Sequence, residues 1–162
     1  MDSFEITVAA DGDLPALVLS VPTGDDLDRI TEICQDADIQ EWTFVPRNYQ
    51  RSDAEFFVEQ VVAKGWNEGR ELTWAIREAD AGASAHLVGM LGITLSGPEG
   101  ARTGEVGYWL AAAARGRGTM TRAVAALIDM AFDSSGPLSL SALRWRCDIH
   151  ETSHGPVPNW AS

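Results

Sequence analysis

The sequence predicts an α/β (α+β) fold, in which a mixed, mostly antiparallel sheet is flanked by helices. Three observations predict it. Several short runs alternate apolar with polar residues, as half-buried strands do, and other runs repeat apolar residues at helical spacing. A glycine-containing turn, Arg115 to Met120, stands between a strand-like run and a helix-like run. A chain of 162 residues can bury a full core, so we expect a single domain over residues 1–162.

The N-terminal part predicts two strands and a helix. Alternating apolar residues indicate strands at residues 4–8 and 17–21. Thr23 and the acidic residues that follow it can cap a helix that ends near Ala37. Residues 39–48, with several large side chains, are interpreted as a loop.

A second helix and a series of strands follow. Ser52 and Glu55 have the spacing of a capping box, which predicts a helix that closes at Gly65. Strands are then predicted at residues 72–76, 86–95, 102–110 and 143–149, with a helix at about 119–132 before the last of them. Consecutive strands joined by short turns should be antiparallel. The strand, turn, helix and strand around the glycines form a right-handed crossover, so its two strands should be parallel.

The glycine turn predicts an anion site. Gly116 and Gly118 let the backbone approach a ligand closely, because no Cβ stands in the way. The helix that follows offers unpaired N–H groups and the positive end of its dipole, which suit a phosphate. Arg115 and Arg117 add positive charge. The turn lacks the Gly-Lys-Ser/Thr of a nucleotide P-loop.

With the strands and helices around it, this turn resembles the pyrophosphate signature of the GNAT superfamily of acyl-CoA N-acyltransferases, Gln/Arg-x-x-Gly-x-Gly/Ala. Arg115 and Gly118 fill the first and fourth positions, whereas Met120 stands where Gly or Ala is usual. Residues 103–110, residues 39–42 and the helix from Ser52 resemble the ribosomal-protein-acetyltransferase (RimJ/RimL) branch. The resemblance covers about residues 17–162.

The resemblance implies the acyl-CoA N-acyltransferase fold and transfer of an acetyl group from acetyl-CoA to a primary amine, either a protein N-terminus or a small amine, by direct attack and without a metal. A backbone N–H near Trp109 would stabilise the oxyanion of the tetrahedral intermediate. The residues implied in cofactor binding are Tyr108, Trp109, Leu110, Arg115, Gly116, Arg117, Gly118, Thr119, Met120 and Asn159.

Glu105 is the candidate general base, since the amine must lose its proton to attack. The alternative is a structural role, in which Glu105 pairs with an arginine such as Arg102 or Arg144. Large side chains between Trp42 and Tyr49 would wall the acceptor pocket or, alternatively, pack in the core.

Relative to the family pattern, the sequence stops early. Asn159 resembles the asparagine that opens the family's next helix, and the helix and strands that usually follow are not in this sequence. A second hypothesis is therefore a CoA-binding or interaction module with impaired catalysis. The strand at residues 143–149 would then be an exposed edge, which invites homodimer pairing.

A competing motif lies just before the end of the sequence. His150, Glu151 and His154 match H-E-x-x-H, the zinc metalloprotease signature, which needs both histidines on one helical face. A strand pattern precedes the motif, and Gly155 and Pro156 follow it at once, so a surface loop is favoured over a helix. A zinc hydrolase remains a remote alternative.

Composition narrows the function classes further. The formal net charge of -12 argues against nonspecific nucleic-acid binding and suits a cationic substrate such as an amine, or simply a solvated acidic surface. The two cysteines, Cys34 and Cys147, do not form a disulfide framework, so a cytoplasmic location is expected. Neither a basic signal-peptide opening nor an apolar run of membrane-spanning length is present.

Overall fold

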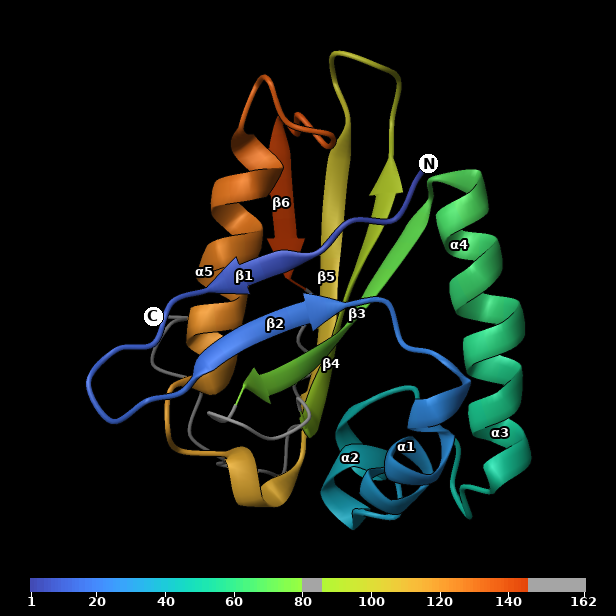
Figure 1. Ribbon diagram of the computed structural model, residues 1–162. Coiled ribbons are helices and arrows are strands. Elements are labelled where there is room, and N and C mark those ends of the chain that lie inside the picture. The colour runs from blue at the N-terminus through green and yellow to red at the C-terminus, as the bar shows by residue number, and fades with distance from the viewer. Residues whose placement is uncertain (80–85, 146–162) are drawn as a thin grey trace, which may run out of the picture.

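A computed structural model of the chain describes residues 1–79 and 86–145, and a six-stranded sheet forms its centre (Figure 1). The strands are β1 (Ile6–Val8), β2 (Ala16–Ser20), β3 (Glu71–Ala79), β4 (His86–Ser96), β5 (Thr103–Leu110) and β6 (Ala142–Trp145). They lie in the order β1-β2-β3-β4-β5-β6. Every neighbouring pair is antiparallel except β5 and β6, which are parallel. The predicted hairpin series and crossover are thus confirmed.

Helices flank this sheet, as the sequence predicts. In Figure 1, α5 lies to the left of β5, while the segments from α1 to α4 lie to its right. The helical segments are η1 (Gly24–Asp26), α1 (Leu27–Ile33), α2 (Ala37–Trp42), α3 (Arg51–Phe56), η2 (Phe57–Val62), α4 (Ala63–Glu68), η3 (Ala112–Ala114) and α5 (Thr119–Phe132). The prediction of a helix over 119–132 matches α5 at both ends.

The core divides into two hydrophobic clusters. The larger cluster packs α4 and α5 against residues of β2 to β5, and Trp74 is completely buried in it. Trp66 stands edge-on to Trp74, with ring centroids 5.1 Å apart. The second cluster packs α1, α2 and α3 against the opposite face of the sheet, through Ala75, Met90 and the partly buried Trp109.

Local signals placed some helix ends wrongly. The predicted loop at 39–48 is wrong in its first part, because α2 continues to Trp42 after Asp36 caps it through the N–H groups of Asp38 and Ile39. The predicted end at Gly65 is also wrong. Gly65 lies inside α4, and the helix ends at Gly69, which has a left-handed φ of 62°.

The two predicted N-terminal caps had different outcomes. Thr23 caps the η1 segment, and Asp26 completes the capping box by accepting from the Thr23 N–H at 2.8 Å, which confirms the prediction. The capping box at the second helix uses Gln50 and Asp53 instead of Ser52 and Glu55. The competing boxes differ by two residues, and the sequence spacing alone does not separate them.

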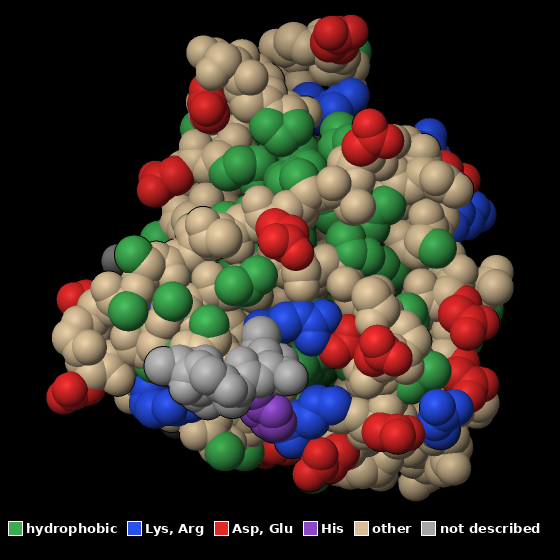
Figure 2. Space-filling view, in the orientation of Figure 1, with side chains coloured by type: hydrophobic (Ala, Val, Ile, Leu, Met, Phe, Trp, Pro, Cys, Tyr) green, Lys and Arg blue, Asp and Glu red, His purple; other side chains and the backbone are tan. Residues whose placement is uncertain are grey.

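The described residues also bear on two surface properties. None of their helices combines the length and apolar character needed to cross a membrane. Acidic side chains are scattered over the face shown in Figure 2, with basic ones beside several of them near its lower edge.

β6 is the last strand in the sheet order of the described part of the chain. The homodimer through this strand stays a prediction, as does the single domain over residues 1–162.

Candidate active site

The glycine turn joins β5 to α5 at the lower end of the sheet in Figure 1. Gly116 and Gly118 have left-handed φ values of 77° and 74°, which L residues other than glycine rarely adopt. Gly118 is the N-cap residue of α5, so the first N–H groups of this 14-residue helix follow it directly. A Cβ added at Gly116 or Gly118 would meet no atom of residues 1–79 and 86–145 within 4 Å, so the described part of the chain leaves space over the turn.

Both arginines of the turn contact carboxylates from distant parts of the chain. Arg115 places its guanidinium nitrogens 3.4 Å from Asp36 and 3.5 Å from Asp38. Arg117 contacts Glu78 at 2.8 Å. The positive charge that the sequence predicts at this turn is therefore partly neutralised by these carboxylates.

β5 leads into the turn with one edge directed away from β4. The N–H of Ala111 donates to the carbonyl of Val88 at 2.7 Å, and the β4–β5 register continues without a shift from there. Because N–H groups alternate in direction along a strand, the N–H of Trp109 points toward β4, while those of Tyr108 and Leu110 point toward the β6 side. Backbone groups of Tyr108 and Leu110, rather than of Trp109, therefore face that side.

The parallel strand beside β5 pairs with only its first half in the described part of the chain. The described pairs run from Thr103 with Ala142 to Val106 with Trp145. Tyr108 and Leu110 lie beyond these pairs, and Arg115 donates its Nε–H to the Leu110 carbonyl at 3.1 Å. The end of β5 on its β6 side therefore leads directly into the glycine turn.

Glu105 lies on the face of β5 that it shares with Trp109. It is half-buried, opposite Thr94 on β4, and its register partner on β6 is Arg144. Of the two arginines proposed as structural partners of Glu105, Arg144 is therefore the one that the strand register places beside it, rather than Arg102. At about 3.3 Å per residue, Glu105 and Trp109 are separated by roughly 13 Å along the strand.

An open cavity of about 630 Å³ lies beside the ion pair of Arg117 and Glu78. The turn between β1 and β2 forms its other wall. The residues that line it are Ala10, Gly12, Asp13, Leu14, Pro15, Ala16, Glu78, Ala79 and Arg117. The cavity therefore adjoins the glycine turn at the end of the sheet.

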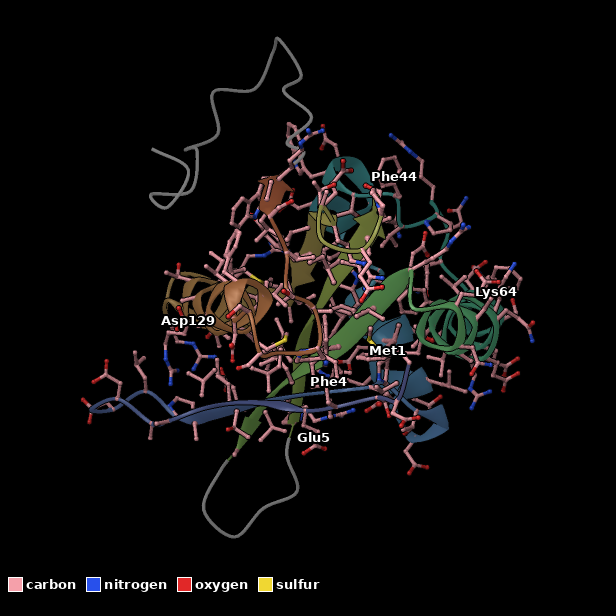
Figure 3. All side chains as sticks on the ribbon, turned by 90° about the horizontal axis from the view of Figure 1, so that it is seen from above. Met1, Phe4, Glu5, Phe44, Lys64 and Asp129 are labelled. Carbon is pink, nitrogen blue, oxygen red and sulfur yellow. The ribbon has the colours of Figure 1, made fainter. Side chains whose placement is uncertain are left out.

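The large side chains after α2 are divided between surface and core. Phe44 is 90% exposed and extends away from the body of the molecule (Figure 3). Trp42 is 42% exposed, whereas Tyr49 is only 5% exposed and packs in the second cluster. The core alternative thus holds for Tyr49, and the loop side chains near Trp42 remain available for a pocket wall.

Several sequence predictions lie outside the described residues. They are Asn159, Cys147, the part of the last strand from residue 146 to 149, and the motif of His150, Glu151 and His154. Among residues 1–79 and 86–145, no group of three or more His, Cys, Asp or Glu side chains is arranged to hold a metal ion.

Sequence reasoning missed the acidic partners of the turn. Asp36 and Glu78 are 79 and 39 residues from the arginines they contact. No local pattern indicates pairs so far apart in sequence. Only the folding of α2 and of β3 brings these carboxylates to the turn.

Comparison with known proteins gives a family. The sequence profile of the acetyltransferase (GNAT) domain matches residues 16–155. No curated protein sequence matched the chain.

Solved structures with the same fold include three acetyltransferases. One, from Vibrio cholerae, is assigned as a ribosomal-protein-serine acetyltransferase, with 22% identity, a TM-score of 0.71, and coverage of 91% of this chain and 76% of that one. The microcin C7 self-immunity acetyltransferase MccE, in complex with acetyl-CoA and AMP, has 20% identity, a TM-score of 0.67, and coverages of 86% and 73%. An acetyltransferase from Salmonella typhimurium that modifies the N-terminal serine of a 50S ribosomal subunit protein has 15% identity, a TM-score of 0.68, and coverages of 84% and 73%. At these identities the similarity shows the shared fold.

Proposed function

Since the chain belongs to the GNAT acetyltransferase domain family, we propose that it transfers the acetyl group of acetyl-CoA to the amino terminus of a protein. The observation that carries the proposal is the turn at Gly116 and Gly118, with left-handed backbone, open space above it and the start of α5 behind it. A helix N-terminus reached through glycines suits a pyrophosphate.

The residues of this end of the sheet fit acetyl-CoA as co-substrate. N–H groups from Arg115 to Met120 would hold its pyrophosphate, with the guanidinium groups of the turn exchanging carboxylate partners for phosphate. Leu110 directs its backbone N–H toward the β6 side, where an extended pantetheine arm can pair with the strand, and Tyr108 and Trp109 remain part of the proposed site. Asn159 remains part of the proposed site. The complex of MccE with acetyl-CoA supports this choice of co-substrate.

The proposed reaction is direct attack of the amine on the thioester. Glu105 accepts a proton from the ammonium group, directly or through water, so that the nitrogen lone pair becomes available. Nitrogen then bonds to the thioester carbon, and an N–H of Tyr108 or Leu110 stabilises the oxyanion that forms. Collapse of the intermediate breaks the carbon–sulfur bond, the nitrogen loses its second proton to leave a neutral amide, and the departing CoA thiolate takes up a proton to become the free thiol.

Two observations support a protein amino terminus as the acceptor. Two solved structures with this fold act, by their descriptions, on ribosomal proteins, one of them on an N-terminal serine. The net charge of -12 attracts a cationic amine, although this effect is not specific for one acceptor.

Release of free CoA thiol, measured with acetyl-CoA and short peptides that have free amino termini, tests the proposal. We expect peptide-dependent thiol release and an acetylated peptide in the mass spectrum. Glu105→Gln should lower kcat by about a hundredfold or more if Glu105 is the base, while Glu99→Gln, in the exposed β4–β5 turn, should not.

Two results would count against parts of this account. If Glu105→Gln retained full kcat, Glu105 would be assigned to the structural alternative beside Arg144. If acetyl-CoA bound without any thiol release, the chain would act as a CoA-binding module, and the transferase function would be rejected.

A further inference from the structure

Two glycines stand side by side on the sheet face that carries Glu105 and Trp109. Gly107 on β5 is directly opposite Gly92 on β4. Because side chains alternate along a strand, Gly107 shares its face with Glu105 on one side and Trp109 on the other. The same face carries Met90, which packs in the second cluster with α1 to α3.

Other glycines of these strands are explained by packing. A Cβ on Gly89 would lie 2.7 Å from the Trp109 carbonyl oxygen, and one on Gly104 would lie 2.6 Å from Ile93 Cδ1. Neither contact is tolerable without a shift of the surrounding atoms. At those two positions the fold itself requires glycine.

Gly107 and Gly92 have no such explanation. Among the described residues, a Cβ at Gly107 would meet nothing within 4 Å, and one at Gly92 would make only ordinary contacts, the nearest at 3.7 Å to the Thr73 hydroxyl. Neither residue has a positive φ. Glycine inside a strand costs roughly 0.5–1 kcal/mol relative to alanine, and it often marks a place where a ligand approaches the backbone.

The strip of sheet surface formed by Gly107 and Gly92 is also accessible to solvent. Gly107 is exposed and Gly92 is partly exposed, whereas Met90 farther along the same face is buried. The missing side chains are about 4.8 Å apart across the strands, and Glu105 and Trp109 stand on either side along β5. Together the two glycines form a strip of bare backbone on the sheet, with the Glu105 carboxylate at one end and the Trp109 indole at the other.

We propose that Gly107, with Gly92 beside it, forms the floor of the acceptor site and determines which amines can react. This inference rests on the proposed function. An amino-terminal residue carries its side chain on the carbon next to the nitrogen, so it needs room beside the amine. An unbranched alkylamine needs no such room. The bare strip therefore admits α-substituted amines, such as the first residue of a peptide, which a side chain at residue 107 would exclude while an unbranched amine would still fit.

Gly107→Val tests the inference, because a Cβ at residue 107 has no neighbour within 4 Å among the described residues and valine favours strands. With peptide acceptors of different first residues, kcat/KM should fall by about tenfold or more, and most for bulky first residues. With butylamine, kcat/KM should be unchanged, as should the acetyl-CoA affinity measured by calorimetry and the melting temperature.

Gly24→Ala is the matched control. Gly24 also lacks a positive φ and has nothing within 4 Å of an added Cβ, but it lies in η1. It should leave every acceptor's kcat/KM unchanged. The inference is overturned if Gly107→Val reacts with all peptides as the parent does, or loses peptide and butylamine activity equally. If the parent chain acetylates no amine, the proposed function fails, and this inference fails with it.

Discussion

A buried ion pair between Asp26 and Arg77 shows how single residues fix this fold. Two guanidinium nitrogens of Arg77 contact the Asp26 carboxylate at 2.6 and 2.8 Å, and the Thr23 N–H donates to the same group. Burial acts to raise the pKa of the Asp26 carboxyl, but hydrogen bonds from Arg77 and Thr23, with the charge of Arg77, lower it overall. The pair thus joins the start of the first helical segment to β3.

Asp26→Asn should destabilise the chain by about 1–3 kcal/mol, because the partly buried Arg77 guanidinium loses its carboxylate partner and keeps the Ser20 hydroxyl. The lowered pKa gives this stabilisation a pH dependence. It is fully present above the ordinary carboxyl pKa of 3.8 and is lost as pH falls through the lower folded-state value. Urea unfolding of parent and variant at several pH values checks this. A difference in stability that stays constant down to strongly acidic pH would contradict it.

Close approach at Gly89 makes a second prediction for a single residue. Gly89→Ala places a Cβ 2.7 Å from the Trp109 carbonyl, so β4 or β5 must move. We expect a loss of about 1–3 kcal/mol in the free energy of unfolding. Gly107→Ala, on the neighbouring strand, should cost nothing or stabilise slightly, since its Cβ meets no atom. Equal effects of the two substitutions in thermal unfolding would contradict this account.

At the scale of elements, α2 is linked to the glycine turn through Asp36. One carboxylate oxygen caps α2, accepting from the Asp38 N–H at 2.8 Å, and the other contacts Arg115 at 3.4 Å. An anion that binds at the turn must compete with this carboxylate for the guanidinium group. The same residue therefore stabilises a helix and would weaken the binding of a phosphate at the turn.

Asp36→Asn and Asp36→Ala should separate these two effects. Asparagine keeps the cap but removes the charge, so acetyl-CoA should bind about two- to fivefold more tightly, as expected for a partly exposed ion pair. Alanine also removes the cap, which should cost about 1 kcal/mol of stability. Calorimetric titration and thermal unfolding of both variants measure the two quantities. Weaker acetyl-CoA binding by Asp36→Asn would contradict the competition.

The elements also show what the sequence can and cannot predict. α5 and the antiparallel strands follow from periodicity, because their apolar faces are regular and their ends carry clear turn residues. α2 is short and lies among large side chains, so its cap at Asp36 gives only a weak signal. The π-helical turns of η2, between α3 and α4, have no marker in the local sequence.

For the molecule as a whole, the sheet brings together parts of the chain that no local pattern relates. The glycines of the turn could be predicted as an anion site, but the carboxylates of Asp36 and Glu78 reach it only through the folded sheet. The contrast between Gly104 and Gly107 likewise depends on neighbours from other strands. The glycine turn between β5 and α5 is thus predictable from the sequence, while the charges around it and the exposed glycines of β4 and β5 are not, and the anion site itself stays a prediction.

The central claim is that this chain binds acetyl-CoA at the turn between β5 and α5. Isothermal titration of the parent chain and of Gly118→Val with acetyl-CoA tests it most directly, since valine cannot readily adopt the φ of 74° at Gly118. The account predicts one site per chain in the parent and a loss of affinity of about tenfold or more in the folded variant. No binding by the parent at millimolar acetyl-CoA, or equal affinity in parent and variant, would contradict it.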